Sequence, residues 1–160
     1  MATNVSESNI TTALSLYNNL STDEKLALLW YVYTRMGTSI TPAAPGAASD
    51  EIAEGLFGQV KELSFDEQLE VQRNIIEGKD TLISREYGSL SKNTKLYFWY
   101  RLAQGMEAGT IIPVPDNYEP SDSVTQLLSQ VEVMDFEQQI TFLRDAVIDG
   151  GTEPKPGADV

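Results

Sequence analysis

Residues 26–33 read LALLWYVY, the most uniformly apolar helical segment of the chain. A surface helix normally shows one apolar stripe, whereas this segment is apolar on every side for two turns, so other elements must cover it. Leu26, Leu29, Trp30 and Tyr33 share one face at helical spacing. The pattern predicts a central helix, which serves either as plain core or as one wall of a binding site.

Helical signals continue on both sides of this segment, and strand patterns are absent apart from the short apolar run 110–112. Three helix starts carry capping chemistry: Ser21–Glu24, Ser64–Glu67 and Asp135–Gln138. Four glycines follow periodic segments, where a left-handed residue commonly ends a helix: Gly37, Gly78, Gly109 and Gly150. The expected helices span residues 8–19, 22–36, 50–62, 65–77, 80–88, 92–108, 121–131 and 135–149.

These signals together predict an all-α protein. Because each of the short helices must bury an apolar stripe, two small bundles packed together are expected. The length of 160 residues suits one domain, which we place at residues 1–150. Residues 151–160 are polar and rich in Pro and Gly, so a flexible tail is expected there.

Composition excludes several classes of function. The chain contains no Cys and no His, and its net charge is −13. It therefore lacks a thiolate nucleophile, the commonest general base and the commonest metal ligands, so neither an enzyme nor a metal site is expected. The acidic surface would repel nucleic acid and anionic lipid. No stretch approaches the roughly 18 apolar residues of a membrane span, and residues 1–9 lack a signal-peptide layout, so we expect a cytoplasmic protein.

A second aromatic stretch, LYFWY at residues 96–100, lies within another predicted helix. Its apolar stripe consists of Leu96, Trp99, Tyr100, Ala103 and Met106. Four consecutive aromatic rings are more than a small core needs, because each ring buries about 150–250 Å². The stretch fits an aromatic core and a surface for an extended π-system equally well.

Two loops complete a candidate channel between helices. Residues 41–48 are tiny residues and prolines, so this loop can approach another surface closely. Residues 110–115, TIIPVP, form a stiff apolar loop that must cover something or be covered, and Tyr118 follows it. The missing His disfavours a heme, and the missing Gly-rich phosphate loop disfavours a flavin or a nucleotide. A long apolar ligand is the class that remains.

Six stretches, most of them in or beside these segments, match a known pattern: Leu26-Ala27-Leu28-Leu29-Trp30, Tyr33-Thr34-Arg35-Met36-Gly37, Ala43-Ala44-Pro45-Gly46-Ala47-Ala48, Lys95-Leu96-Tyr97-Phe98-Trp99-Tyr100, Pro113-Val114-Pro115-Asp116-Asn117-Tyr118 and Gln138-Gln139-Ile140-Thr141-Phe142-Leu143-Arg144. The match runs almost colinearly from residue 20 to residue 150. Here the chain resembles the N-terminal helical domain of the orange carotenoid protein, and most of all the stand-alone helical carotenoid proteins of cyanobacteria.

The resemblance implies two interleaved four-helix bundles with a ketocarotenoid held noncovalently between them: canthaxanthin, echinenone or a related xanthophyll. Such a ligand, about 30 Å long, matches the span of a 20-residue helix. The pocket residues that the resemblance implies are Leu26, Leu29, Trp30, Tyr33, Gly46, Leu96, Trp99, Tyr100, Ala103, Met106, Val114, Pro115, Tyr118, Ile140, Leu143 and Arg144. Trp30, Tyr33 and Trp99 would stack near one terminal ring.

The resemblance also implies a photoprotective role, in which the bound carotenoid quenches singlet oxygen and dissipates excess excitation without any catalytic residue. Two related roles stay open: a constitutive phycobilisome quencher that docks through the region of Arg144, and a carotenoid carrier or storage protein. The implied partners are the carotenoid, the phycobilisome and a carotenoid donor protein resembling the C-terminal domain of longer relatives. The implied location is the cytoplasm, at phycobilisomes on the thylakoid surface. Without the resemblance, a helical protein-interaction module with an aromatic core fits as well.

Four positions in this pattern are harder to interpret. Arg144 is either the docking residue or an arginine whose stem packs beside Leu143 while its head reaches water. Arg73 stands where relatives often carry a small sulfur residue facing the pocket, and a buried charge without a partner would be costly. Tyr97 replaces a common Gly, and Leu90 replaces a common Trp. We expect these departures to change pigment or antenna binding, not the fold.

Overall fold

The computed structural model describes residues 2–36, 50–115 and 117–151, with the backbone alone for residues 2–8 and 50. Helices and their connections make up all of the described chain, so the all-α prediction is confirmed. The helices are α1 (Ala2–Asn18), α2 (Thr22–Met36), α3 (Asp50–Lys61), α4 (Phe65–Glu77), α5 (Leu82–Gly88), α6 (Lys92–Ala108), α7 (Asp122–Glu132) and α8 (Phe136–Ile148). None of them is long and apolar enough to cross a membrane.

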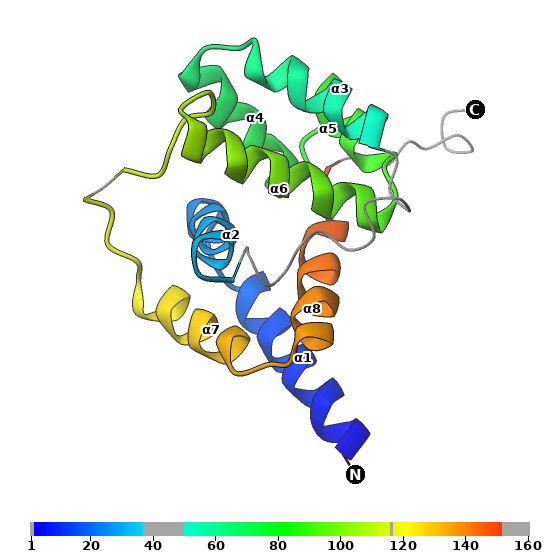
Figure 1. The fold of residues 1–160 in the computed structure, drawn as a ribbon, viewed down its shortest axis with the longest axis vertical. Helices are drawn as coiled ribbons and strands as arrows, with labels where there is room; N and C mark the ends of the chain where they lie inside the picture. The colour runs from blue at the N-terminus through cyan, green and yellow to red at the C-terminus, as the bar shows by residue number, and fades with distance from the viewer. Residues whose placement is uncertain (1, 37–49, 116, 152–160) are drawn as a thin grey trace.

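The helices pack as two groups of four (Figure 1). One group contains α1, α2, α7 and α8, and the other contains α3, α4, α5 and α6. The groups are interleaved along the chain, because the second lies between α2 and α7 in sequence. Helix α2 also packs on α4 and α6, and α8 packs on α6, so these four helices form the interface between the bundles.

Side-chain capping fixes where the helices begin. At α2, Ser21 N–H donates to Glu24 Oε1 over 2.8 Å, and Glu24 N–H donates back to Ser21 Oγ over 3.2 Å. The same reciprocal pair joins Ser64 to Glu67 at α4. At α8 it joins the residues at positions 135 and 138. All three predicted starts are confirmed, because each pair satisfies two backbone N–H groups that the helix itself leaves without partners.

The two largest differences from the predicted helix boundaries are at the starts of α1 and α5; the ends of α1 and α3 and both ends of α7 and α8 differ by one residue. Helix α1 begins at Ala2 instead of residue 8, since no Pro or Gly interrupts the segment up to Asn18. Helix α5 begins after Thr81, whose side chain accepts from the N–H of Ser84, and so starts two residues later than expected.

A further difference concerns the glycines that end helices. Gly78 and Gly109 have φ of 72° and 88°, as predicted, whereas Gly37 lies outside the described residues. Gly150 is not left-handed; Gly151 is, with φ of 77°. The turn comes one residue late because Gly151 N–H donates to Ile75 O over 2.7 Å, which ties the end of α8 to α4. Beyond Gly151, the predicted tail lies outside the described residues.

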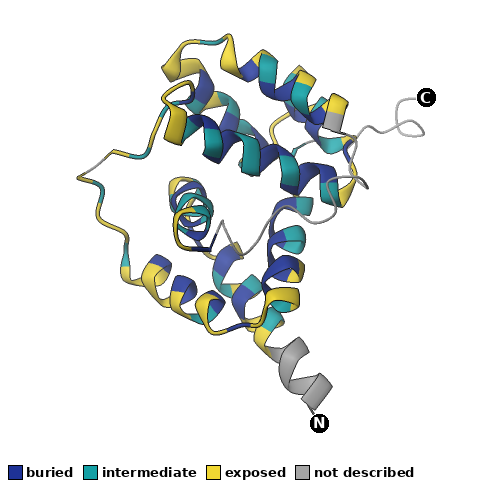
Figure 2. Ribbon diagram, in the orientation of Figure 1, coloured by how far each residue is buried: buried dark blue, intermediate teal, exposed yellow. Residues whose placement is uncertain are grey.

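A single apolar core extends through both bundles. Figure 2 shows buried positions on the helix faces that meet their neighbours, most clearly on α3 and α7, and exposed positions outward. Phe98, Tyr87 and Phe142 are fully buried, and Tyr17 packs edge-on against Phe142 with 6.2 Å between ring centroids. The core therefore positions α6 and α8 rigidly against α1 and α5.

Candidate functional site

The interface between the bundles contains a cavity that opens to solvent. Helices α2, α4, α6 and α8 all contribute to its wall, which is almost entirely apolar. The lining residues are Leu26, Leu29, Trp30, Val32, Tyr33, Gln72, Leu96, Trp99, Tyr100, Leu102, Ala103, Met106 and Leu143. Both tryptophans of the chain therefore face this first cavity.

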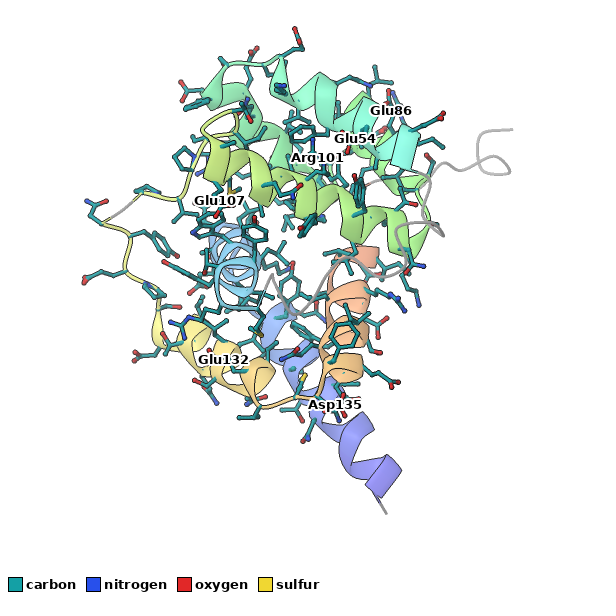
Figure 3. All side chains as sticks on the ribbon, viewed as in Figure 1. Glu54, Glu86, Arg101, Glu107, Glu132 and Asp135 are labelled. Carbon is teal, nitrogen blue, oxygen red and sulfur yellow. The ribbon has the colours of Figure 1, made fainter. Side chains whose placement is uncertain are left out.

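The rings in the first cavity form an ordered wall. Trp30 stacks on Tyr33 with 5.8 Å between ring centroids, and Tyr33 meets Tyr100 edge-on at 5.7 Å. Tyr33 O–H donates to Glu107 Oε1 over 2.8 Å, at the end of α6 labelled in Figure 3. Desolvation, followed by this hydrogen bond, raises the pKa of Tyr33 to about 12. The wall thus stays uncharged at neutral pH.

A buried hydrogen-bond chain fixes the second tryptophan. Trp99 Nε1 donates to the hydroxyl of Tyr87 over 2.8 Å, and Tyr87 in turn donates to Val147 O over 2.7 Å. Burial raises the pKa of Tyr87 well above its usual value, so the hydroxyl keeps its proton. Helices α5, α6 and α8 are joined through these two side chains, which orients the indole ring toward the cavity.

A second cavity, also open to solvent, lies between α2, α4, the end of α6 and the apolar connection that follows α6. The residues that line it are Asp23, Leu26, Ala27, Leu69, Gln72, Arg73, Met106, Ile112, Pro113, Val114, Pro115 and Tyr118. The two cavities share Leu26, Gln72 and Met106, so they adjoin at these residues. We call these two cavities together the channel.

Gln68 anchors the apolar connection along the second cavity. Its Nε2 donates to Thr110 O over 3.1 Å and to Leu63 O over 3.3 Å, and its Oε1 accepts from Ile112 N–H over 2.8 Å. Ile111 is fully buried between these contacts. The expectation that this apolar loop covers something or is covered is confirmed in its first form: residues 112–115 line the second cavity, and Gln68 binds the backbone of Thr110 and Ile112.

Gly105 permits the loop to lie this close to α6. A Cβ at this position would overlap Ile111 Cγ1 and come within 3.1 Å of Thr110 Oγ1. We expect Gly105→Ala to lower the free energy of unfolding by about 1–3 kcal/mol, measured by urea denaturation, because a β-branched neighbour must move. The matched control is Gly55→Ala in α3, where a Cβ meets nothing within 4 Å and the substitution stabilises the helix by about 0.5–1 kcal/mol. Equal stability of the two variants would contradict this packing.

Arg73 lines the second cavity together with its partner Asp23. Arg73 Nε donates to Asp23 Oδ1 over 2.9 Å and Nη2 to Oδ2 over 3.1 Å, a two-point pair between α4 and α2. The hydrogen bonds to Asp23 raise the pKa of Arg73. Its side chain is 39% exposed, so the cost expected for an unpartnered buried charge does not arise.

The other two departures lie away from the channel residues given above. Tyr97 O–H donates to Glu54 Oε2 over 2.7 Å, and Arg101 Nε donates to the same oxygen over 2.6 Å. Figure 3 shows Glu54 on α3 and Arg101 on α6, where the hydrogen bond to Arg101 lowers the pKa of Glu54. Leu90 is buried in the core. Tyr97 therefore joins α6 to α3, and Leu90 contributes to the core.

The structure brings most of the sequence-predicted site residues together. The first cavity is lined by Leu26, Leu29, Trp30, Tyr33, Leu96, Trp99, Tyr100, Ala103, Met106 and Leu143, and the second by Leu26, Met106, Val114, Pro115 and Tyr118. Ile140 is buried and Arg144 half-buried on α8, and neither lines these two cavities. Gly46 lies outside the described residues, as does the loop 41–48. That these side chains contact a ligand stays a prediction.

Sequence reasoning missed most of the contribution of α4, since the resemblance pointed only to Arg73 as a pocket-facing position of this helix. Leu69, Gln72 and Arg73 line the channel from this helix, and Val32 and Leu102 complete the first cavity. A signal for α4 was present, because Leu69, Gln72 and Ile76 recur at helical spacing on one face. Because Gln72 in this row is polar, the row does not look like an apolar stripe in the sequence.

The sequence matches the family described as "Orange carotenoid protein, N-terminal" over residues 3–153. It is 48% identical over 145 residues to an orange carotenoid-binding domain-containing protein of Nostoc sp., covering 91% of this chain and 85% of that one. It is 37% identical over 138 residues to the orange carotenoid-binding protein of Synechocystis sp., covering 86% of this chain and 44% of that one. The chain thus spans less than half of the longer relative.

Solved structures show the same architecture. The Red Carotenoid Protein of Anabaena (Nostoc) sp. binding canthaxanthin superposes with a TM-score of 0.82 at 46% identity, covering 90% of this chain and 99% of that one. The Orange Carotenoid Protein of the same organism, also binding canthaxanthin, gives 0.81 at 40% identity over 89% of this chain and 45% of that one. The fold and the aligned sequence agree, and the chain belongs to the orange carotenoid protein N-terminal domain family.

Proposed function

We propose that this chain binds a ketocarotenoid noncovalently in the channel and protects against light by quenching singlet oxygen and dissipating excitation. The observation that carries this proposal is the pair of adjoining apolar cavities, whose wall includes Trp30 and Trp99. A conjugated ligand about 30 Å long needs an extended apolar slot that crosses the interface between helices. The two cavities, which share Leu26, Gln72 and Met106, together line more of this interface than either does alone.

The lining chemistry fits a carotenoid. Aromatic faces and the polarizable thioether of Met106 make favourable dispersion contacts with a conjugated chain. Leu26, Trp30, Tyr33, Trp99 and Tyr100 would hold the portion in the first cavity, and the residues of the apolar connection the portion in the second. The carotenoid, when bound, supplies the low-lying excited states that accept energy from singlet oxygen. The protein holds and shapes the molecule, and canthaxanthin bound by the Nostoc relatives supports this ligand class.

The test is the colour of the protein expressed beside a ketocarotenoid pathway. We expect visible pigment to copurify with the full chain near one molecule per chain, because only a specific slot gives a fixed stoichiometry. The pigmented protein should then shorten the lifetime of photosensitised singlet oxygen, measured by its near-infrared phosphorescence, relative to the colourless protein. Colourless, monodisperse protein from that host would overturn the proposal.

Finer assignments stay predictions. Docking on a phycobilisome through Arg144, delivery by a carotenoid donor protein, and a carrier or storage role all follow from the resemblance alone. The position of Arg144 is compatible with either interpretation, since its side chain is half-buried and lies one residue from Leu143 of the first cavity. Phycobilisome fluorescence measured with and without pigmented protein separates docking from free quenching.

A further inference from the structure

Four side chains with nitrogen or oxygen atoms line the second cavity: Asp23, Gln72, Arg73 and Tyr118. The carboxylate of Asp23 can only accept hydrogen bonds, and Nε2 of Gln72 has almost no accessible surface. Burial, and then nearby groups that include the carboxylates of Glu24 and Asp23, raises the pKa of Tyr118. Its hydroxyl therefore keeps its proton, which those carboxylates attract. Arg73 is the donor that a ligand in this cavity can reach.

Arg73 is held in one orientation and still has unused N–H groups. Of the five N–H groups of its guanidinium, Asp23 takes the one on Nε over 2.9 Å and one on Nη2 over 3.1 Å. The other three have no acceptor among the described residues. The side chain lines the second cavity and is 39% exposed, so it lies where the cavity opens and has surface that a ligand atom can touch.

The pair of Arg73 and Asp23 lies beyond the junction of the two cavities. Leu26 belongs to both cavities, whereas Arg73 and Asp23 line the second and not the first. Asp23 precedes Leu26 by three residues, which corresponds to about 5 Å along α2. A ligand that extends from the first cavity past the junction thus ends within reach of the pair, with its terminal ring in the second cavity.

The charges around Arg73 favour a neutral acceptor on that ring. The hydrogen bonds to Asp23, and then the charges of Asp23, Glu70 and Glu77, raise the pKa of Arg73. A ligand carboxylate would be repelled by these three groups in a chain of net charge −13. A ketone is neutral and only accepts, so it matches a guanidinium, which only donates. A ring without oxygen would cover the N–H groups and deprive them of water.

We propose that Arg73 determines the specificity of the second cavity: its guanidinium, oriented by Asp23, donates a hydrogen bond to the carbonyl oxygen on the terminal ring of a ketocarotenoid. This inference rests on the proposed function, because it places the same ligand in the channel. It adds a reason for the preference for a keto ring over an unsubstituted ring, and it assigns that preference to one residue of α4.

The experiment detects this hydrogen bond at the ligand. Canthaxanthin carries a ketone on each terminal ring, and a hydrogen bond lowers the stretching frequency of the carbonyl that accepts it. The full chain is loaded with canthaxanthin whose carbonyls carry a heavy oxygen isotope, so that infrared difference spectra separate them from the amide bands. Arg73→Met removes the donors and keeps an unbranched stem. The matched control is Arg85→Met, because Arg85 pairs with Asp80 over 3.3 Å outside both cavities.

We expect a carbonyl band of lowered frequency in the wild-type chain and in Arg85→Met. In Arg73→Met this band should move to higher frequency. The shift should occur even where water replaces the guanidinium, because a charged donor makes a stronger hydrogen bond than a neutral one. A merely structural role of Arg73 would not move the carbonyl band.

Pigment selection provides a second measurement. The colourless chain is equilibrated with phosphatidylcholine vesicles that contain equal amounts of canthaxanthin and β-carotene, which has the same skeleton without the ketones. We expect the wild-type chain and Arg85→Met to bind about three- to tenfold more canthaxanthin than β-carotene, the ratio that one hydrogen bond supplies. In Arg73→Met the ratio should fall to about one. A general loss of uptake through the altered cavity wall cancels in this ratio.

The outcomes separate this inference from the proposed function. A wild-type chain that binds canthaxanthin without a lowered band, or that binds both pigments equally, overturns the inference alone. A band at unchanged frequency in Arg73→Met overturns it too, because another group would then be the donor. If that variant binds too little pigment for a spectrum, Arg73→Lys replaces it, and an unchanged frequency there has the same meaning. A wild-type chain that takes up neither pigment overturns both proposals.

Discussion

Replacing Trp99 with alanine is expected to reduce pigment uptake at least tenfold and to lower the free energy of unfolding by about 3–5 kcal/mol. Trp99 is 6% exposed and lines the first cavity, so the substitution removes packing from the core and from the ligand wall together. It also takes away the donor that Tyr87 accepts from. Uptake is measured as pigment per chain after coexpression, and stability by urea denaturation with helicity followed by circular dichroism.

Two companion variants keep this prediction testable if the alanine variant folds poorly. Trp99→Phe retains a ring at the wall and loses only the N–H group, so most of the uptake should remain. Trp30→Ala acts on a half-buried ring of the same cavity and should impair uptake with a smaller loss of stability. Folded Trp99→Ala with unchanged pigment yield and spectrum would mean that the ligand does not occupy the first cavity.

The second large effect is expected for Gln68→Leu, which should lower the free energy of unfolding by about 2–4 kcal/mol. The leucine fills similar space but leaves the N–H of Ile112 and the carbonyl of Thr110 without their partner. The apolar connection should then detach from α4 and open the second cavity. Hydrogen exchange at Ile112 measures the detachment directly, and pigment uptake should fall with it.

The matched control for this variant is Gln126→Leu on the exposed side of α7, where we expect a change within about 0.5 kcal/mol. Gln68→Leu with wild-type stability and a protected Ile112 amide would show that the loop is held by its own prolines and not by the glutamine.

The helices could be predicted closely because their signals are local. Capping boxes at Ser21, Ser64 and Asp135 satisfy backbone groups within three residues, so the sequence alone reveals them. The errors arose where a distant contact decided the outcome. Gly150 has the residue type for a left-handed end, but the bond from Gly151 to Ile75 moved the turn one residue along.

The candidate site could likewise be predicted only in part. The stripes of α2 and α6 were visible as helical periodicity. The sixteen predicted pocket residues came from the family resemblance, and thirteen of them line one or both cavities. The role of α4 was not visible, since Gln68, Gln72 and Arg73 are polar residues whose tasks depend on partners far away in sequence. Two residues that are 42 or 50 positions apart show no periodic pattern in the sequence that would reveal the hydrogen bond between them.

Residue types and their spacing were enough to predict an all-α protein with two aromatic helix faces and without thiol or imidazole side chains. Those properties are local, because they depend on neighbours along one helix. The packing of the chain was needed to show that the faces of α2 and α6 meet α4 around two adjoining cavities and that Asp23 pairs with Arg73. It was also needed to show that Nε2 of Gln72 is buried without an acceptor among the described residues. Burial and pairing are properties of the packed chain. A side chain is buried when groups distant in sequence exclude water around it, and it is paired when one of those groups supplies the hydrogen-bond partner.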